Sequence, residues 1–175
     1  SGGKCCRCRT WLRQLSTETE TELTQITRGG GTTPYWVACG TGGRIFYTTS
    51  LSGTWQVKQV ISDGYDLTGI VYADGKWVVC GNTGSPDYYP FVAYASLPSG
   101  TWTMKQIASS GTFYTGNTYL TYGNGSWVLA TPNTNSYMWI YYTTDPTGTW
   151  TQKSDHVNGT FVCLTYGDGY FVGSA

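Results

Sequence analysis

Short runs of alternating apolar and polar residues cover most of this chain, and glycine-containing turns separate them. Three of these runs lead directly into an Asp-Gly or Asn-Gly dipeptide, at residues 74–75, 124–125 and 168–169. Asn, Asp and Gly tolerate the positive φ angles that a two-residue β-hairpin requires. The pattern therefore predicts three hairpins whose first strands are residues 70–72, 120–122 and 164–166.

Each hairpin belongs to a longer repeat. Its second strand opens with Trp-Val or Phe-Val, a third strand ends in Tyr-Thr-Thr or Tyr-Ala-Ser, and a fourth follows a Gly-Thr-Trp turn. The opening aromatic residues Trp36, Trp77, Trp127 and Phe171 are 41, 50 and 44 residues apart, which is the spacing of β-propeller blades. We therefore predict an all-β fold with three complete blades of four antiparallel strands and a partial fourth, over repeats of about 32–71, 72–119, 120–163 and 164–175.

Residues 1–31 do not match the repeats. The spacing of the apolar residues over 11–27 suits a helix, whereas the Thr-Glu alternation over 17–22 suits an exposed strand equally well. Arg28 and the three glycines after it are typical of a linker. The sequence thus predicts a non-repeat N-terminal segment and a Gly-rich linker before the repeats begin at residue 32.

One turn resembles a known motif. Residues 143–150 resemble the Asp-box of sialidase-type and related bacterial and phage propellers, Ser/Thr-x-Asp-x-Gly-x-Thr-Trp, although Gly148 comes one position late. Ser50 and Leu97 stand where the family has Asp, so the repeats over 32–175 resemble a degenerate form. The resemblance implies a propeller in which this box is a structural turn remote from any active centre. It therefore implies no activity.

Composition narrows the classes of partner and cofactor. Ten basic and ten acidic side chains cancel, and the repeats carry no Lys/Arg cluster, which excludes nucleic acid and anionic membranes as expected partners. No apolar run approaches the roughly 18 residues of a membrane helix, so we expect a soluble protein, extracellular or virion-associated. The run Cys5-Cys6-x-Cys8 lacks the usual zinc-ligand spacing, and we predict neither metal nor cofactor.

The positions of the cysteines in the repeats predict that they are packing residues of the core and that they do not form a disulfide framework. Cys39 and Cys80 occupy one repeat position, and Ala130 occupies it in the third copy. A residue that exchanges with alanine behaves as a small buried apolar group.

The repeats also lack the residues of a sialidase mechanism, which needs an arginine cluster and a tyrosine paired with a glutamate. Residues 32–175 contain Arg44 as their one arginine and contain no Glu. Asp63 and Asp66 are interpreted as turn residues, and the neighbours Ser154, Asp155 and His156 cannot form a catalytic triad in line. We therefore predict that the protein is not an enzyme.

Candidate binding residues are those that the repeats do not share. Lys58, Lys105 and Lys153 recur three positions after Trp and are interpreted as scaffold or rim. Two insertions, 82–90 and 132–139, are rich in Tyr, Trp, Asn and Ser, a composition typical of protein- and glycan-binding surfaces. The alternative is that these aromatic residues cover blade edges or a contact between chains. The candidates are Asp87, Tyr88, Tyr89, Asn135, Tyr137 and Trp139.

Three blades and part of a fourth are too few to close a ring, which takes four to eight blades. We expect either association of copies into a homo-oligomer that closes the propeller or a longer propeller of which this is a piece. The leading functional hypothesis is a non-enzymatic binding or structural module, on a phage or bacterial surface, that recognises a glycan or a surface protein. The alternatives are a self-assembling scaffold without a small ligand and a remnant of a glycoside hydrolase or lyase.

Overall fold

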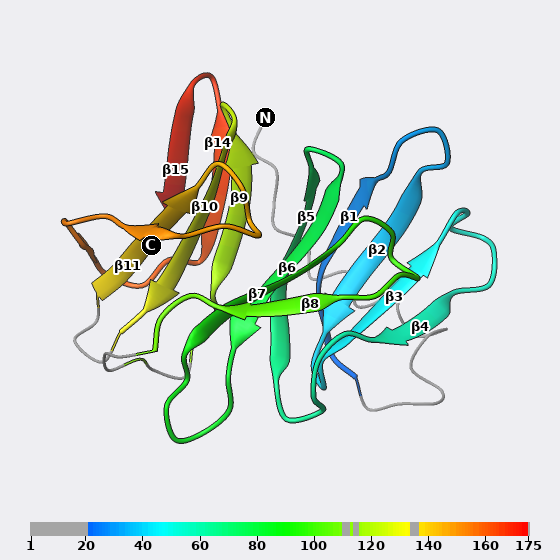
Figure 1. The fold of residues 1–175 in the computed structure, drawn as a ribbon, viewed down its shortest axis with the longest axis horizontal. Coiled ribbons are helices and arrows are strands. Elements are labelled where there is room, and N and C mark those ends of the chain that lie inside the picture. Colours follow the sequence, from blue (N-terminus) through cyan, green and yellow to red (C-terminus); the bar gives the residue numbers. More distant parts are fainter. Residues whose placement is uncertain (1–20, 110–112, 114–115, 134–136, 175) are drawn as a thin grey trace.

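The computed structural model describes residues 21–109, 113, 116–133 and 137–174. The regular secondary structure in this part consists of β-strands alone (Figure 1). The strands are β1 (Leu23–Gly29), β2 (Tyr35–Gly40), β3 (Arg44–Thr48), β4 (Gln56–Gln59), β5 (Asp66–Ala73), β6 (Lys76–Asn82), β7 (Pro90–Ala95), β8 (Thr103–Gln106), β9 (Tyr119–Gly123), β10 (Ser126–Pro132), β11 (Tyr137–Thr143), β12 (Thr151–Gln152), β13 (Val157–Asn158), β14 (Cys163–Gly167) and β15 (Tyr170–Ser174).

These strands form four antiparallel sheets in the order that the repeats predict. We call β1-β2-β3-β4 blade 1, β5-β6-β7-β8 blade 2, β9-β10-β11-β12 blade 3 and β14-β15 blade 4. The short strand β13 also pairs with β11. The all-β expectation, with four strands in a complete repeat and fewer in the last, is confirmed.

The predicted hairpin turns have the predicted backbone. Asp74, Asn124 and Asp168 have φ angles of 48°, 47° and 50°, and the glycine after each also has a positive φ. These turns join β5 to β6, β9 to β10 and β14 to β15, along the upper edge of the molecule in Figure 1. Turn chemistry at three two-residue sites therefore sets the register of three blades.

The first strands of successive blades lie next to one another: β1 contacts β5, β5 contacts β9 and β9 contacts β14. A tyrosine on each later first strand packs on its own hairpin partner, with ring centroids 4.8 Å apart for Tyr72–Trp77 and 4.9 Å for Tyr122–Trp127. Tyr72 also lies against Gly29 of the preceding blade, where an added Cβ would come within 2.4 Å of the ring. Small residues on one blade thus make room for the aromatic residue of the next.

The core lies between blades. One cluster joins Val37, Cys39 and Ile45 of blade 1 to residues of blade 2, and a second joins Val78, Cys80 and Val92 of blade 2 to blade 3. Burial of these apolar side chains between sheets is the main stabilising contribution that the fold offers.

The two repeat cysteines are free and fully buried, as is Ala130, which confirms their interpretation as small packing residues. Burial raises the pKa of the Cys39 thiol to about 11 and also raises the pKa of Cys80. Both sulfurs are therefore neutral members of the core at ordinary pH.

The N-terminal expectation needs correction. Of the two alternatives for this segment, the helix over 11–27 is wrong at 23–27, which belong to β1, while residues 1–20 lie outside the described part. The predicted linker is wrong at Arg28 and Gly29, which pair with Trp36 and Tyr35 of β2. Residues 23–29 form a strand because its backbone groups then form hydrogen bonds with β2, and because the strand can also pack against β5. Blade 1 consequently begins at Leu23 and not at residue 32.

The described residues contain no helix long and apolar enough to cross a membrane.

Candidate functional site

A pocket of about 440 Å³ opens where β5 begins and β6 ends, next to the segment that leads into β9. The register pairs Asp66 with Asn82 at this edge, so the two side chains belong to adjacent strand ends. The pocket is lined by Gly64, Asp66, Thr68, Asn82, Thr83, Gly84, Ser85, Tyr88, Gly116 and Asn117. It therefore lies between blades 2 and 3, under the insertion that joins β6 to β7.

Hydrogen bonds across the blade boundary hold the floor of the pocket. The Asn82 Nδ2 donates to the Gly116 carbonyl at 2.7 Å, and its Oδ1 accepts from the Thr118 hydroxyl at 2.5 Å. The Thr68 hydroxyl donates to the Thr118 carbonyl at 2.6 Å. Because Asn82 uses both ends of its amide in these bonds, we interpret it as a positioning residue that fixes blade 3 against blade 2.

Tyr88 adopts an uncommon backbone conformation at the rim. Its φ is 50°, in the left-handed region that bulky residues rarely occupy. The loop around it is held by two bonds between Thr83 and Tyr89: the Thr83 N–H donates to the Tyr89 carbonyl at 2.9 Å, and the Tyr89 N–H donates to the Thr83 hydroxyl at 2.8 Å. Backbone strain of this kind clusters at functional sites, where the surrounding structure maintains it.

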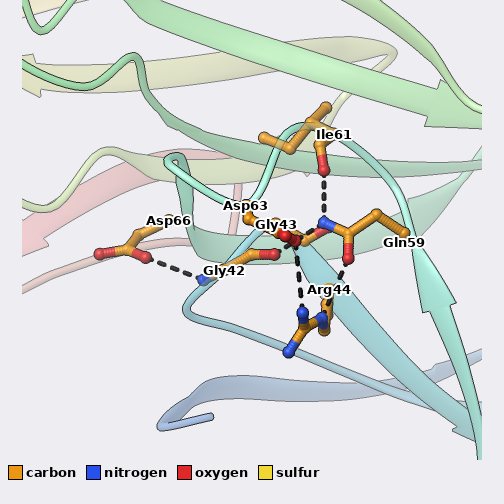
Figure 2. A network of polar contacts seen from close by, with 7 residues as sticks. All are labelled: Gly42, Gly43, Arg44, Gln59, Ile61, Asp63 and Asp66. Carbon is orange, nitrogen blue, oxygen red and sulfur yellow. Dashed lines mark hydrogen bonds and ion pairs between the residues drawn. The ribbon is translucent and has the colours of Figure 1, made fainter. Parts of the chain in front are cut away.

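Asp66 connects the pocket to a polar network in blade 1 (Figure 2). Its Oδ1 accepts from the Gly42 N–H at 3.0 Å. Gln59 stabilises the turn that contains Gly42, because its Nε2 donates to the Gly42 carbonyl at 2.7 Å. Arg44 donates to Gln59 at 2.9 Å and pairs with Asp63 at 3.3 Å. The network thereby fixes the Asp66 carboxylate at the pocket edge.

The structure separates the candidate residues that the sequence identified. Tyr88 lines the pocket, and Asp87 is exposed on the same loop outside the pocket lining. Tyr89 and Trp139 pack edge-on against the buried Phe113, with ring centroids 5.8 and 5.5 Å away, across the boundary of blades 2 and 3. Tyr137 packs against His156 in a tilted arrangement, with ring centroids 4.1 Å apart, and is not among the residues that line the pocket. Asn135 lies outside the described residues.

Sequence reasoning missed most of the pocket lining. Asp66 was assigned to a turn, whereas it begins β5, and Asn82 and Asn117 were not candidates. The start of the insertion at residue 82 was a usable signal for Asn82. Counting back from the turn at 74–75 pairs that residue with Leu67, and only the register shift between Leu67 and Gly69 brings Asp66 opposite Asn82.

Two ion pairs occur between charged side chains of the described part, and both join residues close to each other in the fold. Arg44 bonds with Asp63, and Lys153 bonds with Asp155 at 3.3 Å. Among the residues with a described position, no group of three His, Cys, Asp or Glu side chains could hold a metal ion. Of the described residues that line the pocket, Asp66 is the one with a carboxylate, so its chemistry there is hydrogen bonding and charge.

The Gly-Thr-Trp turns follow β3, β7 and β11, so they lie at the ends of the strands that are opposite to the pocket. Each is closed by one backbone bond, from Gly53 to Ser50, from Gly100 to Leu97 and from Gly148 to Asp145. In the third, the Asp145 carboxylate also accepts from the Thr147 N–H at 3.0 Å and hydroxyl at 2.8 Å. These two bonds lower the pKa of Asp145. The turn is shared scaffold and is separate from the pocket.

No protein family model matches the sequence, and no curated protein matches it. Among solved structures, the fold is similar to YCF48 from Cyanidioschyzon merolae, with a TM-score of 0.54 and 20% identity, over 77% of this chain and 38% of that one. The fold is that of a β-propeller. A mutant of Trypanosoma rangeli sialidase that displays trans-sialidase activity matches with a TM-score of 0.48 and 10% identity, over 86% of this chain and 33% of that one.

The chain thus spans 38% of the length of the first solved structure and 33% of the second. At these identities the likeness concerns the arrangement of blades alone. The pocket between blades 2 and 3 must be judged on its own residues.

Proposed function

We propose that this propeller is a non-enzymatic binding module that recognises an uncharged glycan through the pocket between blades 2 and 3. The observation that carries the proposal is the lining: the ring of Tyr88, the carboxylate of Asp66 and the amide of Asn117 surround about 440 Å³. This volume lies within the range of roughly 300–1,000 Å³ that small-ligand sites occupy.

A sugar matches these groups in chemistry. An aromatic ring offers a flat apolar surface for the C–H face of a pyranose, while a carboxylate and amides accept and donate hydrogen bonds to its hydroxyls. The formal net charge of zero gives no long-range attraction for a strongly charged ligand. The hydrogen bonds that fix Asn82 and Asp66 preorganise the site, which reduces the entropic cost of binding.

A glycan array with the wild-type chain tests this function, and two variants locate the site. Asp66→Asn keeps an oxygen that can accept the Gly42 hydrogen bond but removes the charge, and Tyr88→Ala removes the ring. Each should weaken binding of the selected glycan at least tenfold, because Asp66→Asn replaces a charge-assisted hydrogen bond to the ligand with a neutral one and Tyr88→Ala removes the apolar contact of the ring. Titration calorimetry with that glycan measures the change.

The matched control is Tyr137→Ala, which removes a half-buried tyrosine of the other insertion that packs against His156 away from the pocket. It should bind as the wild type does. A blank array, or equal losses in Tyr137→Ala and Tyr88→Ala, would reject the proposed site. Thermal unfolding of each variant shows whether a loss of binding reflects a loss of fold.

A further inference from the structure

The dipeptide Asn-Gly occurs twice in the chain, and the fold holds the two copies differently. Asn124 and Gly125 form the turn between β9 and β10, whereas Asn158 ends β13 and Gly159 follows it. A hydroxyl residue comes next in both copies, so the local sequences nearly match. Asparagine is a thermolabile residue, and a glycine after it has no side chain to shield its backbone nitrogen. The two sites therefore separate the effect of the fold on this chemistry from the effect of the sequence.

The reaction at such a pair is an attack by the glycine nitrogen on the asparagine side chain. The nitrogen bonds to Cγ, the Cγ–Nδ2 bond breaks, and ammonia leaves with the proton of the glycine nitrogen, so that a five-membered succinimide forms. Water then opens the ring at either carbonyl and leaves aspartate or isoaspartate. Because the ring is planar, Cβ and the glycine nitrogen must be eclipsed about the Cα–C bond when it closes.

The hairpin turn holds Asn124 far from this geometry. Its φ is 47° and that of Gly125 is 72°, so both residues lie in the left-handed region of a two-residue turn. The ψ there is about +30 to +60°, which places Cβ about 150–180° from the next nitrogen. Gly123 pairs with Ser126 across the turn, and most residues of β9 and β10 are buried. Attack on Asn124 therefore requires a stable hairpin to open.

Asn158 lies in a strand of two residues on the outer edge of blade 3, where β13 pairs with β11. A strand backbone has a ψ of about +100 to +180°, which leaves Cβ about 60–140° from the next nitrogen, so a smaller rotation closes the ring. Asn158 and Thr160 are both exposed. Short exposed pairings open at low free energy, and Asn158 can consequently reach the reactive geometry without unfolding of the blade.

Exposure at the outer edge is common to the blades. Val57 on β4 is 54% exposed and Met104 on β8 is 38% exposed, although a further blade packs against the sheet of each. Asn158 pairs with Tyr137, and alternate residues share a face, so its side chain lies on the same side of blade 3 as Tyr141. That side faces blade 2, because Tyr141 is buried in the cluster between blades 2 and 3. Blades 2 and 3 thus set the surroundings of Asn158.

We propose that Asn158 with Gly159 is a site of spontaneous deamidation in the folded protein, and that the hairpin turn protects Asn124. Aspartate at 158 keeps the main chain of β13 and adds a negative charge. Isoaspartate leads the main chain through Cγ and converts the former backbone carbonyl into a free carboxylate, so the pairing with Tyr137 is lost. This inference concerns a different surface from the glycan pocket and stands apart from it.

The other hairpin turns show that the protected position tolerates the product. Asp74 and Asp168 stand where Asn124 does, with φ angles of 48° and 50°. Asn124→Asp should therefore unfold at the same denaturant concentration as the wild type. An Asn124 that stays unconverted then reflects a slow reaction, and not a loss of the molecules in which it reacted.

Incubation of the full chain at pH 8, followed by peptide digestion and mass spectrometry, tests the proposal. Asn158 should convert at least tenfold faster than Asn124, because Asn124 reacts only from an open hairpin. In a concentration of urea that unfolds the chain, the two rates should become nearly equal, since the local sequences match. Amide hydrogen exchange in β13 should quicken as isoaspartate accumulates, and Asn158→Gln, which lengthens the side chain, should abolish both changes.

Equal rates at the two sites in the folded chain would overturn the proposal. A difference that persists in urea would overturn it as well, because the sequence and not the fold would then set the rates. So would an Asn158 that stays intact in the folded chain while a peptide of residues 153–163 converts under the same conditions.

Discussion

The hairpins β5–β6 and β14–β15 have the same design but different surroundings. Both turn through an Asp-Gly pair with a positive φ at Asp, and in both a tyrosine packs on the aromatic residue that opens the second strand, with ring centroids 4.8 Å apart. Yet Trp77 is fully buried, whereas Phe171 is 39% exposed. The same turn and the same aromatic pair therefore form in both hairpins, while the burial of the opening aromatic residue differs with the strands around it.

The largest expected difference between the two hairpins is in the free energy of unfolding lost when the opening aromatic residue of the second strand is removed. Trp77→Ala should cost about 3–5 kcal/mol of unfolding free energy, because it leaves a cavity between blades 1 and 2. Phe171→Ala should cost less than about 1 kcal/mol, because a half-exposed ring loses less buried area. Denaturant unfolding followed by circular dichroism measures both. Equal losses would contradict the assignment of stability to the outer strands.

A smaller effect is expected at the glycines on which the tyrosines pack. Gly123→Ala should cost about 1–3 kcal/mol, because its Cβ would come within 2.0 Å of the Tyr166 ring and the hairpin must shift. Amide exchange should quicken in β14 and β15 and stay unchanged in β5 and β6.

Gly64→Ala is the control for this prediction, since nothing lies within 4 Å of its Cβ position. A Gly123→Ala protein with wild-type exchange in β14 would show that Tyr166 does not dock blade 4 against blade 3.

These two hairpins show why much of the fold could be predicted from the sequence. Asp-Gly turns and a recurrent aromatic spacing are local signals, and they predicted four strands in a complete repeat. The first strand of blade 1 was missed, since β1 lacks the Tyr of its equivalents. Arg28 stands there, with its guanidinium 5.8 Å from the Trp36 ring centroid. The glycines at 29–31 were interpreted as a linker, although they lie at the end of β1 and in the turn that joins it to β2.

The pocket was harder to predict than the blades. Its lining joins a strand start, a strand end, an insertion and the segment before β9, at residues 64–68, 82–88 and 116–117. Composition identified the insertion and Tyr88 but not which tyrosine faces the pocket, because Tyr89 one position later turns to Phe113. Side-chain direction in an irregular loop follows from backbone angles, such as the φ of Tyr88, that no alternation encodes.

The reactivity of the cysteine thiols should also differ between the inner blades and blade 4. Cys80 is buried between blades, and its equivalent in blade 4 is Ser174, whose hydroxyl lies 3.1 Å from the exposed Cys163 sulfur. At pH 8 a thiol reagent should modify Cys163 and spare Cys39 and Cys80. Mass spectrometry after peptide digestion reads this out.

Stability should also fall as pH rises above 9. A thiol whose folded pKa is raised favours folding below its unfolded pKa and loses this contribution as pH rises toward the folded pKa. For Cys39, with a pKa of about 11, the loss should be about 1 kcal/mol by pH 10. Cys39→Ala should remove this share, as Ala130 fills the equivalent position. An unchanged pH dependence in that variant would show that Cys39 does not titrate with unfolding.

The smallest expected effect compares the Gly-Thr-Trp turns of blades 2 and 3. Asp145 accepts two hydrogen bonds from Thr147, whereas Leu97 at the equivalent position is 51% exposed and forms only the backbone bond. Asp145→Leu should cost roughly 0.5 kcal/mol at pH 7, since exposed polar contacts contribute little. Because the pKa of Asp145 is lowered on folding, this contribution is present above the usual carboxyl pKa, near 4, and is lost as pH falls through the folded value. The two proteins should therefore converge in thermal stability at acidic pH, and a difference that persists at pH 2 would assign the effect to packing and not to the carboxylate.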